Sequence, residues 1–204
     1  MTREGETRVS LDKAGANPVM VEVSRGPIVE SRHRGSAVIV DLDGKVQGAW
    51  GEVKQAVYPR SAIKGIQALP LIETGAADDF AFSDAELAMA CASHGGEEEH
   101  ARTVLGVLER LGLGEADLEC GPHWPMHEES ARALAIRGEM PSQLHNNCSG
   151  KHMGMLAVAK TLGKATKGYI QQTHAVQQRV LGVFEAMCGL DLSDAPVGFD
   201  GCSV

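Results

Sequence analysis

The hydrophobic pattern of this 204-residue chain changes its period near residue 60, and this change limits the possible folds more than any other feature. Apolar residues alternate with polar ones over residues 18–24, which predicts a half-buried strand, and the continuous apolar run over 37–40 predicts an interior strand. Asp43 and Gly44 predict a hairpin turn into a partner strand over 45–50. From residue 60 the apolar residues recur at helical spacing. We therefore expect a small antiparallel sheet over residues 18–60, followed by a mainly helical region over residues 61–192.

The helical region carries several boundary signals. Ser83 and Glu86 have the capping-box spacing, and Pro70 is expected to bend or end the first helix. Residues 151–162 are apolar on all sides, which predicts a central buried helix. Further helices are expected over 97–111 and 128–136 and from residue 173, and a strand is expected to start over 195–199. This order predicts a single α+β domain over residues 1–204 whose closing strands are missing.

The composition excludes several classes of partner. A net charge of −8 and only 4% aromatic residues argue against nucleic acid or an anionic membrane as the main partner. The first residues carry no apolar signal segment, and no run approaches the ~18 apolar residues of a membrane span. The five cysteines are an odd number, which disfavours a full disulfide framework. We expect a cytoplasmic protein with reduced thiols, no nucleic-acid partner and no membrane partner.

Ser61 and Lys64 lie one helical turn apart. Residues i and i+3 share a helix face, so the amine can reach the hydroxyl. A buried lysine that has lost its proton can act as general base for such a serine. The pattern is weak by itself, because Ser10 and Lys13 have the same spacing in a polar tail. The alternative is a serine that caps a helix beside a solvated lysine.

Ser93 and His94 precede two glycines at the end of an apolar helical stretch. Adjacent side chains on a helix do not face each other, so these two residues are not a nucleophile–base pair. The loop can still present Ser93 or backbone amides to a substrate. The alternative is a helix C-terminus that ends on glycine.

Cys148 and Lys151 lie one turn apart at the start of the central helix, and Cys202 follows much later in the chain. Thiolates suit zinc, but zinc normally takes further Cys or His ligands, and no nearby C-x-x-C supplies them. His145 and His152 are candidates for the remaining positions. The alternative is a buried, hydrogen-bonded thiol with no metal.

Together these segments resemble a known family. The resemblance rests on an opening run over residues 25–33 and, in order, on Tyr58-Pro59-Arg60-Ser61-Ala62-Ile63-Lys64, Cys91-Ala92-Ser93-His94, Asn147-Cys148-Ser149-Gly150-Lys151-His152 and Asp200-Gly201-Cys202. This set is similar to the Rhizobium-etli-type L-asparaginases, the asparaginase II family, from about residue 21 to the last residue. The run after Asn147 with the late Asp-Gly-Cys is the specific part.

The resemblance implies an amidohydrolase that converts L-asparagine to L-aspartate and ammonia. It implies a fold similar to serine β-lactamases and penicillin-binding proteins, with two serine–lysine tandems beside a Zn²⁺ ion. The matching catalytic positions are Ser61, Lys64, Ser93 and Asp200. The matching zinc ligands are Cys148, Lys151 and Cys202. We further expect the motif residues that contact the substrate to be Arg60, His94, Asn147 and Gly150.

The chain departs from the family pattern at its end. The family continues past the Asp-Gly-Cys segment into strands that bring the second tandem's lysine, whereas this sequence stops at Val204. We therefore expect a truncated chain with weak activity alone and a tendency to associate, in the family's case as a homodimer. The alternatives are a non-catalytic zinc- or amino-acid-binding fragment and a penicillin-binding-like acyl transferase.

Overall fold

The computed structural model describes residues 17–198 and 201–202. The chain divides into two compact units, Met1–Tyr58 and Pro59–Val204. Within the described residues, the first unit holds antiparallel strands and the second holds seven α-helices. This confirms the expected α+β class. The expectation that residues 1–204 form one domain stays a prediction.

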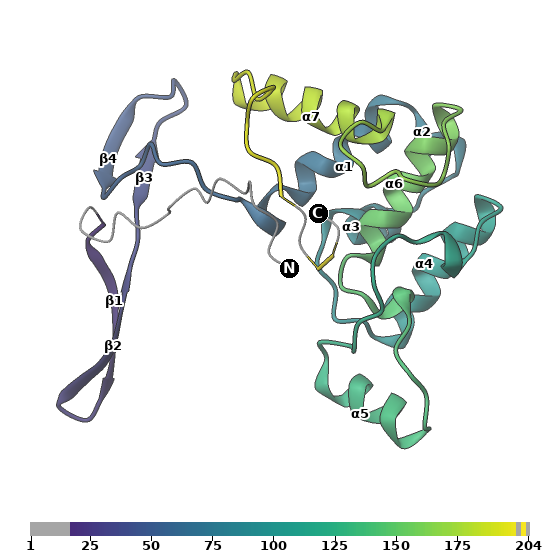
Figure 1. The fold of residues 1–204 in the computed structure, drawn as a ribbon, viewed down its shortest axis with the longest axis horizontal. Coiled ribbons are helices and arrows are strands. Elements are labelled where there is room, and N and C mark those ends of the chain that lie inside the picture. The colour runs from purple at the N-terminus through teal and green to yellow at the C-terminus, as the bar shows by residue number, and fades with distance from the viewer. Residues whose placement is uncertain (1–16, 199–200, 203–204) are drawn as a thin grey trace, which may run out of the picture. The chain divides into compact units, whose positions relative to one another are not determined.

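The first unit consists of two hairpins (Figure 1). Strand β1 (Val19–Arg25) pairs with β2 (Ile28–Arg34), and β3 (Ala37–Val40) pairs with β4 (Val46–Trp50), both antiparallel. The structure therefore has two separate two-stranded sheets among the described residues, rather than the one small sheet that the pattern predicts.

The turn between β3 and β4 follows the sequence signal. The Asp41 carboxylate accepts hydrogen bonds from the backbone N–H groups of Asp43 and Lys45, and Gly44 has a φ of +76°, which only glycine adopts at little cost. This confirms the predicted hairpin. The prediction of an interior strand over 37–40 is wrong, because β3 pairs with one strand only and Ile39 and Val40 are each 54% exposed.

The second unit is helical, and its elements are numbered in Figure 1. The α-helices are α1 (Lys64–Glu73), α2 (Ala76–Asp79), α3 (Asp84–Cys91), α4 (Glu98–Arg110), α5 (Glu128–Ile136), α6 (Ser149–Thr161) and α7 (Ala175–Cys188). Short 3₁₀ turns are η1 (Arg60–Ile63), η2 (Glu115–Asp117) and η3 (Gln143–His145). The predicted capping box at the start of α3 is confirmed, since Ser83 and Glu86 exchange side chain–backbone hydrogen bonds.

Helix α6 is the centre of this unit, with α1, α3 and α4 gathered around it (Figure 1). Every residue from Ser149 to Ala159 is buried, which confirms the predicted central helix. Glycine at position 150 lets the start of α6 approach α3 closely, because a Cβ there would overlap the Met89 backbone. Gly154 packs in the same way against Leu71 of α1. The close helix packing fixes where the ends of these helices lie.

Two local expectations differ from the structure. Pro70 does not end its helix; it lies buried inside α1, which continues to Glu73 because burial of Pro70 and Leu71 stabilises it against the lost backbone donor. Residues 195–198 form no strand, and residue 199 lies outside the described residues. Among the described helices, none is both long and apolar enough to cross a bilayer.

Candidate active site

Lys64 is the centre of the candidate site. It is the first residue of α1, and its side chain is buried, with only 1% of the residue exposed. Its Nζ atom lies 2.6 Å from the Ser93 hydroxyl oxygen, 3.1 Å from the Ala92 carbonyl oxygen and 3.1 Å from the Cys148 sulfur. A single amine thus meets atoms from the end of α3 and the start of α6.

The two candidate serines form a short chain with this amine. The Ser93 hydroxyl donates a hydrogen bond to the Ser61 hydroxyl at 3.2 Å, so the structure connects Lys64 to Ser61 through Ser93. The helical spacing predicts a direct Ser61–Lys64 contact instead. Both serines are exposed while the lysine is buried. A substrate carbonyl can therefore approach the hydroxyls without reaching the amine.

The backbone just before Ser61 is strained. Arg60, which is exposed, has a φ of +50°, a left-handed conformation that a residue with a Cβ rarely adopts. Such strain persists only where the surrounding structure fixes it, and it gathers at functional sites. The predicted contact between Arg60 and substrate stays a prediction.

Cys148 is the N-cap residue of α6 and is buried. The Asn146 side chain accepts the Cys148 N–H at 2.8 Å and donates to the Gly121 carbonyl at 2.8 Å, which holds the turn before α6 in place. The neighbouring Asn147 points elsewhere, with its side-chain oxygen 3.2 Å from the Cys202 sulfur. The polar side chains of the sequence motif therefore lie together at the start of α6.

Cys202 is held against α6 by its backbone as well as by its thiol. The Cys202 carbonyl lies 2.9 Å from Nε2 of His152, whose Nδ1 lies 2.7 Å from the Tyr169 hydroxyl. A carbonyl can only accept, so Nε2 carries a proton and donates to the Cys202 carbonyl, while Nδ1 shares a hydrogen bond with the Tyr169 hydroxyl. That hydroxyl in turn accepts the Glu119 N–H at 2.8 Å.

His145 and His152 are the two histidines that the sequence offers as further metal ligands. Both ring nitrogens of His152 lie at hydrogen-bond distance from protein atoms, and Nδ1 of His145 lies near the Ser142 backbone and hydroxyl.

Tyr169 is a supporting residue that sequence reasoning missed. It lies in a loop with no motif around it, so no local signal would have found it.

Two of the predicted zinc ligands lie at the start of α6, where Cys148 is the N-cap and Lys151 is buried in the first turn. The sulfur of the third, Cys202, lies 3.2 Å from the Asn147 side-chain oxygen just before that turn. Among the described residues, however, no group of three or more His, Cys, Asp and Glu side chains is placed to hold a metal. The donor set fits zinc only if Lys151 supplies the third ligand as a neutral amine beside two thiolates.

Of the two remaining predicted residues, only Gly150 has a definite place. It lies at the contact between α6 and α3, where it allows close packing, and a substrate contact stays a prediction. Asp200 lies outside the described residues.

His94 lies directly after Ser93 and is buried. Burial lowers its pKa to about 4, and the positive charges that His100, Lys64 and His145 can carry add to this shift. Its backbone N–H donates to the Asn147 carbonyl at 3.1 Å, which ties the Ser93 loop to the turn before α6. Contact between His94 and substrate stays a prediction.

A family model described as L-asparaginase II matches residues 21–204. No curated protein matches the chain.

Proposed function

Because the chain belongs to the L-asparaginase II family, we propose that it hydrolyses L-asparagine to L-aspartate and ammonia. The observation that carries this proposal is the series of contacts from the buried Lys64 amine through Ser93 to the Ser61 hydroxyl. Hydrolysis of an amide through a serine needs a base that takes the hydroxyl proton during attack. A lysine amine at hydrogen-bond distance from a serine supports that role.

Ser61 is the proposed nucleophile and Ser93 the proposed relay. In the resting arrangement Ser93 donates to Ser61. Hydroxyl groups rotate freely about their C–O bond, so the same oxygen positions also allow Ser61 to donate to Ser93 and Ser93 to donate to a neutral Lys64 amine. In that arrangement the Ser61 proton moves to Ser93 while the Ser93 proton moves to Lys64.

The reaction then proceeds in two steps, acylation of Ser61 and hydrolysis of the acyl-serine. The Ser61 oxygen forms a bond to the side-chain amide carbon of asparagine, and the carbonyl oxygen becomes an oxyanion. The C–N bond breaks as the proton held by Lys64 passes to the leaving nitrogen, which departs as ammonia. A water molecule then attacks the acyl-serine and gives a proton to the same base. The ester bond to Ser61 breaks, the Ser61 oxygen takes that proton back, and L-aspartate is released.

Zn²⁺ is part of the proposal. Cys148, Lys151 and Cys202 would hold it, and a bound ion would supply positive charge that orients the charged end of the substrate. Cys148, one of the three proposed ligands, also contacts Lys64, so this ligand and the base are direct neighbours. We also propose the Rhizobium-etli-type subclass, a fold similar to serine β-lactamases, and a homodimer.

Ser93 is the alternative nucleophile, because its hydroxyl is the one in direct contact with Lys64. An asparagine analogue that carries a diazoketone in place of the amide will alkylate the activated hydroxyl. Peptide mass spectrometry then locates the label. Label on Ser61 supports the relay, and label on Ser93 assigns the nucleophile to Ser93.

Ammonia release tests the function itself. We expect Ser61→Ala and Lys64→Met each to reduce turnover of L-asparagine by at least about 10³-fold, and the double variant to be no worse, because the two residues act as a unit. Ser130→Ala, a change on α5, is the matched control and should leave turnover unchanged. Ammonia release that survives both Ser61→Ala and Ser93→Ala would overturn the proposal.

A further inference from the structure

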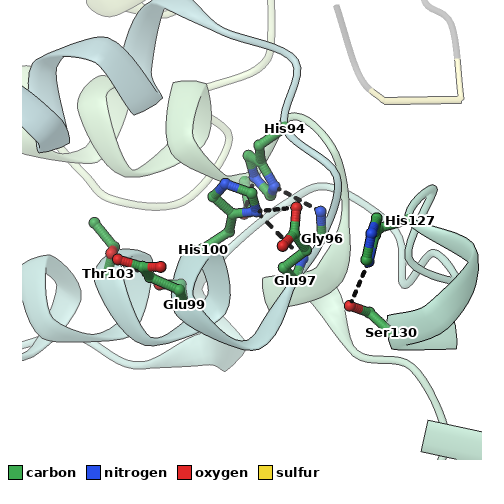
Figure 2. A network of polar contacts seen from close by, with 9 residues as sticks. His94, Gly96, Glu97, Glu99, His100, Thr103, His127 and Ser130 are labelled. Atoms are coloured by element: carbon green, nitrogen blue, oxygen red, sulfur yellow. Dashed lines mark hydrogen bonds and ion pairs between the residues drawn. The ribbon is translucent and has the colours of Figure 1, made fainter. Parts of the chain in front are cut away.

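The ring of His94 bridges two backbone segments that carry the candidate site. Figure 2 shows the ring beside Gly96, whose N–H donates to Nδ1 at 3.1 Å. On its other side, Nε2 lies 2.9 Å from the Ser149 hydroxyl, and that hydroxyl donates to the Leu144 carbonyl at 2.9 Å. Both His94 and Ser149 are buried.

The two ends of this series fix the position of every proton in it. A backbone N–H can only donate, so Nδ1 of His94 must accept and carries no proton. A carbonyl can only accept, so the Ser149 proton points to Leu144 and the Ser149 oxygen is left to accept from Nε2. The ring is therefore neutral and protonated on Nε2. A proton on Nδ1 would face the Gly96 donor.

We propose that His94 is a positioning residue: its ring, protonated on Nε2 and bonded to Ser149, holds Ser93 against Lys64. This inference rests on the proposed function, because it assigns a role in the same reaction. His94 follows Ser93 directly, and Ser149 follows Cys148 directly. The ring thus fixes the distance between the segment with the relay hydroxyl and the segment with the thiol that contacts the same amine.

The surroundings of the ring keep it neutral. His100 of α4 lies with its ring centroid 5.1 Å away, Lys64 comes from α1, and His145 comes from η3. Positive charge on any of these three neighbours disfavours protonation of the His94 ring, and burial of the ring disfavours it more strongly. A histidine that stays neutral keeps its two hydrogen bonds across the pH range in which the enzyme would work.

A second histidine–serine pair offers a matched control. Figure 2 also shows His127, whose Nδ1 lies 3.0 Å from the Ser130 hydroxyl at the start of α5. The side-chain contact is formed within one helix end, whereas the His127 backbone N–H donates to the Gly95 carbonyl at 3.1 Å, in the loop that follows Ser93. Ser130→Ala removes the histidine–serine hydrogen bond and leaves that backbone contact in place.

The test combines ring NMR with kinetics on the full chain. Long-range ¹H–¹⁵N spectra should show the His94 ring protonated on Nε2 alone at pH 7. Ser149→Ala should lower kcat for L-asparagine about tenfold with KM within about twofold, since the variant misplaces a catalytic hydroxyl without removing a substrate contact. Ser130→Ala should leave both constants unchanged.

Replacement of the ring itself gives a second, graded readout. His94→Gln keeps a donor near Ser149, whereas His94→Asn keeps only an acceptor near Gly96. Because the contact with Ser149 is the one that joins the two segments, the Gln variant should retain more kcat than the Asn variant. The double variant His94→Gln/Ser149→Ala should lose no more kcat than the more impaired of the two single variants, because both changes act on one contact.

Three results would overturn the inference. A ring protonated on Nδ1, an unchanged kcat in Ser149→Ala, or a KM that rises while kcat holds in the His94 variants would each do so; the last would assign His94 to substrate contact. Wild-type protein without ammonia release would overturn the proposed function as well, whereas turnover with the wrong ring tautomer would overturn this inference alone.

Discussion

Replacing Gly150 with alanine puts a methyl group where α6 meets α3. A Cβ at this position would lie 2.8 Å from the Met89 carbonyl carbon and closer still to its oxygen. The obstacle is backbone, so one of the two helices must move. Overpacking of this kind costs about 1–3 kcal/mol, while alanine gains at most about 1 kcal/mol over glycine inside a helix. The second residue of α6 gains less, so we expect a net loss of about 1–2 kcal/mol in the free energy of unfolding.

Urea denaturation and thermal melting measure this loss. For a chain of this size, about 1 kcal/mol corresponds to roughly 2–4 °C, so the melting temperature should fall by about 2–8 °C. Gly106→Ala in the middle of α4 is the control, because nothing lies within 4 Å of its Cβ, and it should raise stability slightly. Gly154→Ala meets side chains rather than backbone, with the end of Leu71 at 3.0 Å and the Ala90 Cβ at 3.4 Å, and should cost less than Gly150→Ala.

The same variant separates packing from substrate contact. A shift of α6 displaces Cys148 from Lys64, so turnover should fall together with stability. If Gly150→Ala is as stable as Gly106→Ala, the close approach of α6 to α3 is wrong. If stability is kept and only KM rises, the methyl group blocks substrate, as the sequence motif predicts.

Three further outcomes follow from contacts of single residues. Tyr169→Phe removes the hydroxyl shared by a buried histidine and a backbone N–H, which should cost about 1–3 kcal/mol and speed thiol labelling of Cys202 relative to the surface cysteines. Unchanged labelling would contradict the role of the Tyr169–His152 hydrogen bond in holding Cys202 in place. Burial raises the pKa of Glu86, but hydrogen bonds from Arg110 and the α3 cap outweigh it and hold the pKa below its ordinary 4.5. Its contribution is therefore present above pH 4.5 and lost as the pH falls through the lowered value, so Glu86→Gln should cost about 1 kcal/mol at pH 7 and little at pH 3. A cost independent of pH would contradict this. Zinc should co-purify at about one ion per chain and be lost in Cys148→Ser and Cys202→Ser, as metal analysis would show, because thiolates dominate the donor set. Zinc retained in the double variant would exclude the site.

Local signals predicted most of the helices and the hairpin of β3 and β4. The capping box at Ser83 is a contact between near neighbours, and the buried α6 follows from apolar residues on every side of the helix. Both are properties of a few consecutive residues. Burial of the strand over 37–40 depends on what covers it, which the run itself does not encode, and Pro70 continues its helix because tertiary packing outweighs its local preference.

The residues of the candidate site could be found in the sequence, but not their partners. Lys64 meets Ser93 across 29 residues and Cys148 across 84, so helical spacing alone pointed to Ser61 as the direct partner. Ser149 and Tyr169 support the site through single hydrogen bonds between distant segments. Only the packing of α1, α3 and α6 determines such contacts.

The contrast between a buried amine and two exposed hydroxyls decides which chemical probes can reach this protein. Lys64 is closed off by the Ala92 carbonyl, the Ser93 hydroxyl and the Cys148 sulfur, so acylating and cyanate reagents that modify surface lysines should spare it in the folded state. Ser61 and Ser93 face outward and are open to electrophiles. Covalent inhibitors for this chain should therefore carry a serine-reactive group, and the protection of Lys64 from lysine reagents can serve as a report of an intact fold.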